Sequence, residues 1–263
     1  MEIQFQNVSY RFSRTSKPFL HSIDWQSSSP EIIGLLGING SGKSTFLRLL
    51  AGILSPTDGR ITINDQQVTG MSSVKNNLCY VPENAKLFLM GPTLRVDLSR
   101  IFQDKDREVS LLKISGIEHL ADTKIYELSE GQRRLVAIWL AFQLNRQILL
   151  FDEPTIGMDI QGKKLFFSLL KTAVSEGKTV IIASNDSRIL PLFDRISVIE
   201  DKKISLDGPR EMVLYRLEKE TQLIPNQIVR LITSLQESGI DIPFFTSVDE
   251  LNQFLISIKR RGS

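Results

Sequence analysis

The chain contains 263 residues, of which 41% are hydrophobic and 24% charged, the composition of an ordinary globular protein. Its 32 basic and 30 acidic residues nearly cancel, so no strong field favours nucleic acid or an anionic membrane as a partner. The single cysteine, Cys79, excludes an internal disulfide framework. We expect neither a signal peptide nor a membrane span, because the start lacks a basic and apolar leader and no apolar run approaches ~18 residues.

The first part of the chain follows the pattern of strand, glycine loop and helix. Alternating Ile3, Phe5 and Val8 predict a strand at the edge of a sheet within residues 1–12. Residues 31–36 form a short apolar run, typical of a strand buried in a parallel sheet. Glycines follow this run at once, and apolar residues then recur at helical spacing.

Later apolar runs predict further strands at residues 60–64, 77–81, 148–151, 179–183 and 195–199. Between them, residues 93–146 have a mostly helical pattern. After Gly208, two apolar stripes at helical spacing predict two more helices. The order of these elements indicates an α/β protein whose core carries a helical insertion.

Residues 37–44 fit the phosphate-binding pattern G-x-x-x-x-G-K-[ST]. Glycines let consecutive backbone N–H groups turn toward phosphate oxygens, and the following helix adds its positive N-terminal dipole. We expect Lys43 to reach the β- and γ-phosphates and the Ser44 hydroxyl to bind Mg²⁺. The expected nucleotide-binding residues of this loop are Asn39, Gly40, Ser41, Gly42, Lys43, Ser44 and Thr45.

An acidic pair, Asp152 and Glu153, ends the predicted strand at residues 148–151. The carboxyl end of a strand in a parallel sheet opens onto the ligand crevice. We therefore expect Asp152 to hold the Mg²⁺ shell through water. Glu153 is expected to polarise the attacking water as general base, or to orient it.

Residues 128–132, Leu-Ser-Glu-Gly-Gln, lie between the phosphate loop and the acidic pair, where Ser129 can cap the following helix. With all three motifs in this order, the chain resembles the ATP-binding cassette (ABC) family, in which this pentapeptide contacts the nucleotide of a second subunit. The resemblance implies a signature motif acting in trans, made of Leu128, Ser129, Glu130, Gly131 and Gln132. Glu130 departs from the family's more usual glycine, and its charge would face a phosphate unless it points away.

Other positions can be carried over from the family one at a time. Phe12 resembles the aromatic residue that stacks on adenine. Glu83 stands where the family often has a glutamine that touches Mg²⁺ and the membrane partner, and it keeps an oxygen ligand. Asp159 resembles the acidic residue of the D-loop, which couples the two active sites.

Asn185 stands where the family usually has a histidine that contacts the γ-phosphate and positions the attacking water. An asparagine amide can donate a hydrogen bond, but it can carry neither a proton nor a charge. His21 and His119 are the histidines of the chain, and neither is near this motif in sequence. Two readings stay open: a tolerated substitution with working hydrolysis, or a weakened site that depends on a more complete partner.

The resemblance spans residues 1–210. It implies a P-loop NTPase (RecA-like) core with a parallel sheet, an antiparallel N-terminal β subdomain, and a helical subdomain inserted at about residues 84–146. Residues 211–263 are expected to form a helical C-terminal extension. Within it, residues 223–228 and 246–255 resemble the tails of energy-coupling-factor ATPases, which drive uptake of vitamins or transition metals.

The family implies an ATP hydrolase that uses Mg²⁺ and works as a peripheral subunit at the cytoplasmic face of the cell membrane. Its implied partners are a second ABC ATPase subunit, identical or different, and an integral membrane transporter subunit, without nucleic acid. Two alternatives remain: an ABC ATPase of a soluble machine, or a weakly hydrolysing regulatory cassette, the latter because of Asn185.

Overall fold

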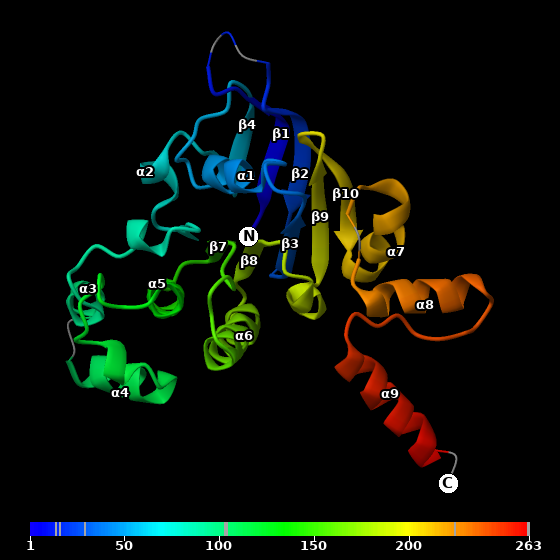
Figure 1. Cartoon of the computed structure of the whole chain (residues 1–263). Helices are drawn as coiled ribbons and strands as arrows, with labels where there is room; N and C mark the ends of the chain where they lie inside the picture. Colours follow the sequence, from blue (N-terminus) through cyan, green and yellow to red (C-terminus); the bar gives the residue numbers. More distant parts are fainter. Residues whose placement is uncertain (14, 16, 29, 103–104, 224, 262–263) are drawn as a thin grey trace.

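The computed structural model describes residues 1–13, 15, 17–28, 30–102, 105–223 and 225–261. In this part of the chain, two β-sheets lie together at the centre and helices surround them (Figure 1). The helices α3 and α4 lie on one side of the sheets, and α7 to α9 lie on the other (Figure 1). No helix among the described residues combines the length and the apolar character that crossing a membrane requires.

The α-helices of the described chain are α1 (Lys43–Leu50), α2 (Met71–Val74), α3 (Leu94–Ile101), α4 (Lys105–Ser115), α5 (Glu130–Gln143), α6 (Ile160–Ser175), α7 (Arg210–Glu220), α8 (Gln227–Glu237) and α9 (Val248–Arg261). Three short 3-10 helices are described beside them, namely η1 (Ala85–Leu87), η2 (Glu118–Leu120) and η3 (Ser187–Leu192). The two helices predicted after Gly208 correspond to α8 and α9, and α7 precedes them.

Over the described residues, the larger sheet has the order β10 (Lys203–Pro209), β9 (Arg195–Glu200), β3 (Ile32–Leu36), β8 (Thr179–Ala183), β7 (Ile148–Asp152) and β6 (Leu78–Val81). Its strands pair in parallel, apart from β10, which runs antiparallel to β9. The predicted buried strands are confirmed, but β10 was not predicted. The strand order brings the carboxyl ends of β3, β8 and β7 next to one another.

The smaller sheet is antiparallel, with the order β2 (Leu20–Ser27), β1 (Ile3–Tyr10), β4 (Asp58–Ile63) and β5 (Gln66–Gln67). It confirms the antiparallel β unit that the family resemblance implied. The prediction of an edge strand at residues 1–12 is wrong, because β1 pairs with β2 on one side and with β4 on the other. Alternation reports which face of a strand is buried, whereas its place in the sheet depends on distant pairing.

The side chains of the parallel sheet alternate between two apolar cores. From β3, Ile33 and Leu35 face the core shared with α1 and the antiparallel sheet, whereas Ile32 and Leu36 face the core shared with α5 and α6. Cys79 lies in the second core at 6% exposure, where burial raises the pKa of its thiol to about 12. Cys79 therefore packs as a small buried apolar residue.

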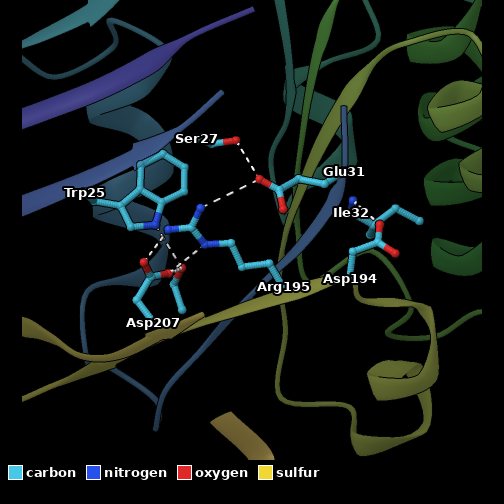
Figure 2. A network of polar contacts seen from close by, with 8 residues as sticks. Trp25, Ser27, Glu31, Ile32, Asp194, Arg195 and Asp207 are labelled. Carbon is cyan, nitrogen blue, oxygen red and sulfur yellow. Dashed lines mark hydrogen bonds and ion pairs between the residues drawn. The ribbon is translucent and has the colours of Figure 1, made fainter. Parts of the chain in front are cut away.

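A polar network joins the antiparallel sheet to the edge of the parallel sheet (Figure 2). The guanidinium of Arg195 on β9 donates to Asp207 of β10, with Nε 3.0 Å from Oδ1, and approaches Glu31 at 3.8 Å. It also lies 5.8 Å from the ring centroid of Trp25 on β2. Ser197 completes the connection, accepting from the Trp25 indole at 2.9 Å and donating to Asp207 at 2.6 Å.

Candidate functional site

Three segments predicted to contact the nucleotide, which carry the glycine loop, the acidic pair and Asn185, meet at one end of the parallel sheet. The glycine loop follows β3, the acidic pair ends β7, and Asn185 follows β8, which lies between β3 and β7. A cleft of about 940 Å³ opens there. Its lining comprises Phe19, Asn39, Gly40, Gly42, Lys43, Ser44, Thr45, Glu83, Glu153, Thr155, Ile156, Gly157, Lys163, Asn185 and Asp186.

The glycine loop wraps around the amino group of Lys43. This side chain is 7% exposed, and its Nζ donates to the carbonyl oxygens of Gly37 at 2.7 Å and Ile38 at 3.3 Å. Gly42 has φ +125°, and a Cβ there would lie 2.5 Å from the side chain of Leu20. Burial lowers the pKa of Lys43, while the nearby acidic pair raises it. The loop thus places a buried amine at the start of α1, as phosphate binding requires.

Two of the oxygen donors expected for Mg²⁺, Ser44 and Asp152, lie together, and the third, Glu83, lines the cleft. Ser44 Oγ donates to Asp152 Oδ1 at 3.0 Å, and Tyr80 OH donates to Asp152 Oδ2 at 3.2 Å. Asp152 is 2% exposed, and this burial raises its pKa. Among the described residues no group of three His, Cys, Asp or Glu could hold a metal by itself. A hydroxyl and one carboxylate fit Mg²⁺, which keeps several waters and shares substrate phosphates.

Glu153 points toward the segment after β8. Its Oε2 accepts from Ser184 Oγ at 3.2 Å and from the Asn185 backbone N–H at 3.4 Å. Its backbone is left-handed, with φ +47°, an uncommon conformation for a residue other than glycine. Burial raises the pKa of its carboxyl group. A carboxylate with a raised pKa at the cleft wall is suited to accept a proton.

The segment after β8 connects the cleft wall to the glycine loop. Asn185 Nδ2 donates to Asn39 Oδ1 at 2.6 Å. Next to it, Asp186 Oδ2 accepts from Thr155 Oγ1 at 3.2 Å and lies 3.8 Å from the Nζ of Lys163 on α6. Lys163 was not predicted, because no pattern in residues 160–175 separates this lysine from surface ones.

Two aromatic residues of the cleft region, Phe19 and Tyr80, were also not predicted. Phe19 lines the cleft, whereas the predicted adenine-stacking residue, Phe12, is 64% exposed and is not among the lining residues. The two rings contact each other, with centroids 4.8 Å apart, and Lys202 Nζ lies 4.3 Å from the Phe19 ring. The stacking role of Phe12 stays a prediction. Tyr80, which bonds Asp152, comes from β6, and only its strand was predicted.

The signature residues lie outside the main cleft. Ser129 caps α5 in a full capping box: its Oγ accepts from Gln132 N at 3.2 Å, and Gln132 Oε1 accepts from Ser129 N at 2.9 Å. Ser129, Gly131 and Gln132 line a second hollow of about 180 Å³ together with Asp159. Gly157 lines both this hollow and the main cleft. The predicted helix cap is confirmed, and action in trans stays a prediction.

Two further predicted residues have local partners. Glu130 extends along α5 to Arg134, with Oε1 3.2 Å from Nη2, so its charge is paired one helical turn away. Asp159 caps α6, because its Oδ1 accepts from Gly162 N at 2.7 Å. Asp159 still lines the hollow beside Ser129 and Gly131, whereas Glu130 is not among its lining residues.

Comparison with known proteins gives the same assignment as the motifs. The family model described as ABC transporter matches residues 20–156. The chain is 32% identical to the energy-coupling factor transporter ATP-binding protein EcfA2 of Caldanaerobacter subterraneus subsp. tengcongensis, over 92% of each protein. It is 29% identical to the corresponding EcfA1 of Halalkalibacterium halodurans, over 91% of this chain and 84% of that protein.

A solved structure has the same fold over most of its length. The protein cbiO1 from Clostridium perfringens, described as part of the ABC transporter complex cbiONQ, is 25% identical with a TM-score of 0.67. The match covers 89% of this chain and 98% of that protein. With the phosphate loop, the acidic pair and the signature motif in their expected order and place, the chain belongs to the ABC transporter family of ATP-hydrolysing cassettes.

Proposed function

We propose that this chain pairs head to tail with a second cassette and drives a membrane subunit that takes up a vitamin or a metal ion. The proposed pairing rests on the observation that the phosphate loop and the signature motif lie on two separate surfaces. The phosphate loop lines the main cleft, whereas Ser129 and Gly131 line a different hollow. A second cassette related by a twofold rotation would place its signature motif at the main cleft of this chain. The nucleotide of the second cassette would then lie at the hollow around Ser129.

Within the cleft, we assign phosphate binding to the loop around Lys43 and water activation to Glu153. Phosphoryl transfer depends mainly on positioning and on charge stabilisation, to which the buried amine of Lys43 would contribute. Mg²⁺, when bound, neutralises charge on the phosphates. The Ser44 hydroxyl would bind the ion, and Asp152 would hold its water shell. The Glu153 carboxylate would accept the proton of the attacking water, because its raised pKa increases its basicity.

Known relatives support transport rather than a soluble machine. EcfA2 and EcfA1 are named as transporter ATP-binding proteins, and cbiO1 is described as part of a transporter complex. A dimeric cassette, MJ0796, is described in a post-hydrolysis state with ADP and Pi. The contact to the γ-phosphate across the interface would exist only in the closed dimer. The dimer would therefore close when ATP binds and open after hydrolysis.

Pairing can be tested by measuring mass in solution with and without Mg-ATP. The Glu153→Gln variant should bind ATP, hydrolyse it on the order of 100-fold or more slowly, and accumulate as an ATP-dependent dimer. Lys43→Ala serves as the variant that cannot hold phosphate. Ser129→Arg should keep ATP binding and lose association. An absence of ATP-dependent association, with the chain alone and with any co-purifying cassette, would refute pairing.

The membrane partner can be tested by purifying the full chain from detergent-solubilised native membranes. We expect a multi-span protein and a second cassette to be recovered with it. Reconstituting that complex in vesicles and following uptake of labelled vitamins, Co²⁺ and Ni²⁺ would identify the cargo. Recovery with soluble proteins alone would contradict the proposed transport role.

A further inference from the structure

Arg134 on α5 contacts two loops of the cleft and the signature residue Glu130 through one buried side chain. It is 3% exposed. Nη1 donates to the carbonyl oxygens of Glu153 at 3.0 Å and Ile156 at 2.7 Å. Nη2 donates to the carbonyl oxygen of Glu83 at 2.8 Å and to Glu130 Oε1 at 3.2 Å. Its Nε is buried, and no partner for it exists among the described residues.

Burying the Arg134 guanidinium among these partners costs free energy. A buried cation needs strong pairing, but three of its partners are neutral carbonyls. Its carboxylate partner, Glu130, has a side chain that is 70% exposed, so solvent screens that ion pair. A guanidinium is nevertheless well suited to this task, because its rigid fork donates in several fixed directions at once.

The carbonyls belong to two loops that are far apart in the sequence. Glu83 follows β6, whereas Glu153 and Ile156 lie in the loop between β7 and α6, which also carries Asp159. Glu83, Glu153 and Ile156 all line the cleft. A single guanidinium therefore fixes the spacing of these two cleft loops relative to α5.

The contact with Glu153 constrains an unusual backbone. Glu153 adopts φ +47°, which costs conformational energy and persists only where neighbours hold it. Its N–H donates to the Ala183 carbonyl at 2.8 Å, and its own carbonyl accepts from Arg134. The direction of the Glu153 carboxylate depends on this backbone. Arg134 is thus placed to set that direction.

We infer that Arg134 is a positioning residue that links the signature end of α5 to the backbone of Glu153. The inference rests on the proposed role of Glu153 in water activation. A shift of α5, when its capped end meets a partner's nucleotide, would pass through Arg134 to the Glu153 and Glu83 carbonyls. Turnover in this cleft would therefore depend on the state of the signature motif in the same chain.

The test compares Arg134→Lys and Arg134→Gln with the wild-type chain. Lysine keeps the charge but cannot donate to three carbonyls in fixed directions. We expect kcat, expressed per chain that binds ATP, to fall on the order of 10- to 100-fold. The Kd for ATP should stay within about twofold, because neither variant alters the phosphate loop. An unchanged kcat per binding chain, or equal losses of binding and turnover, would overturn the inference.

Arg210→Lys is the matched control. Arg210 likewise donates to a carbonyl, that of Pro191 at 2.7 Å, although its side chain is 20% exposed, and it lies outside the cleft. Its replacement should leave kcat unchanged. Glu153→Gln, measured in parallel, separates the two proposals. If Glu153→Gln keeps wild-type turnover, the assigned role of Glu153 is wrong; if only the Arg134 variants keep it, the positioning role is wrong.

Hydrogen exchange gives a reading that does not depend on turnover. In Arg134→Lys, amides of residues 83–87 and 153–158 should exchange faster, whereas the parallel strands should keep their protection. Faster exchange across the whole chain would indicate general loosening and would count against a positioning role. Unchanged exchange in both segments would overturn the inference as well.

Discussion

Asn185 donates from its side-chain amide to Asn39 of the phosphate loop at 2.6 Å, while its backbone N–H faces Glu153 at 3.4 Å. The residue that replaces the family histidine therefore joins the loop after β3 to the proposed base through hydrogen bonds alone. Neither contact requires a proton to move or a charge on the side chain. This geometry favours working hydrolysis over a site that needs a histidine.

The first prediction concerns this connection. Asn185→Ala removes the bond to Asn39 and should lower kcat about tenfold, equivalent to about 1.4 kcal/mol. Asn185→His restores a donor and should change kcat by less than about threefold, since one ring N–H suffices for the same role. Steady-state hydrolysis of Mg-ATP measures both. Wild-type turnover in Asn185→Ala would show that the bond has no part in hydrolysis.

The second prediction concerns pH. Burial raises the pKa of Glu153, so its carboxylate becomes protonated at a higher pH than an ordinary glutamate would. A base works only when deprotonated, so kcat should be full above the raised pKa and should fall as the pH drops through it. The Kd for ATP, measured over the same range, controls for titration of the nucleotide. A kcat that falls only where an ordinary glutamate titrates, or does not fall at all, would contradict this role for Glu153.

The third prediction concerns the metal. Chelation with EDTA should stop hydrolysis, and added Mg²⁺ should restore it. Asp152→Asn keeps a group that can bond Ser44 and Tyr80 but removes the negative charge that holds the Mg²⁺ shell. We expect a loss on the order of 10- to 100-fold in kcat/KM, with partial recovery at high Mg²⁺. Equal Mg²⁺ dependence in the variant and the wild type would exclude Asp152 from the metal site.

The fourth prediction concerns the signature motif. A Cβ on Gly131 would lie 2.2 Å from the carbonyl oxygen of Gly157, a backbone atom that cannot move without its loop. Gly131→Ala should therefore separate α5 from residues 155–159 and weaken ATP-dependent pairing. The Kd for ATP of the single chain should change little. Pairing as strong as that of the wild type, seen by sedimentation, would show that this contact is not needed.

The fifth prediction concerns stability. Asp207→Ala removes the carboxylate that pairs with Arg195 and accepts from Ser197 (Figure 2). The paired side chains are 22% and 27% exposed, so the loss should be about 1.5 to 3 kcal/mol of unfolding free energy, nearer the lower value. Asp58→Ala, at an exposed position on β4, should cost less than about 0.5 kcal/mol. Urea denaturation measures both, and equal midpoints would exclude a stabilising role for the network.

Local patterns predicted much of the site because its chemistry is local. Backbone N–H groups around a phosphate need glycines in sequence, and a helix start needs its cap within three residues. The loop before Lys43 and the cap at Ser129 were therefore predicted from short stretches, as was the acidic pair at the end of β7. The apolar runs of β3 and β8 likewise predicted buried strands, since both faces are covered.

Other features depend on contacts between distant segments. The central place of β1, the antiparallel β10, and the approach of Phe19 and Lys163 to the cleft all follow from which elements pair in space. Arg134 illustrates this most clearly, because in sequence it is one of two adjacent arginines on an ordinary amphipathic helix. Its proposed positioning role depends on the hydrogen bonds that it donates to the carbonyls of Glu83, Glu153 and Ile156.

The family, the phosphate loop, the acidic pair and the signature motif could be predicted from local patterns, because each needs particular side chains at fixed spacing. How these motifs are connected within the subunit depends on the tertiary structure. It turned the Glu130 charge toward Arg134, joined Asn185 to Asn39, and fixed the backbone of Glu153 from two sides. Such contacts link residues brought together by the strand order, and no local pattern records them.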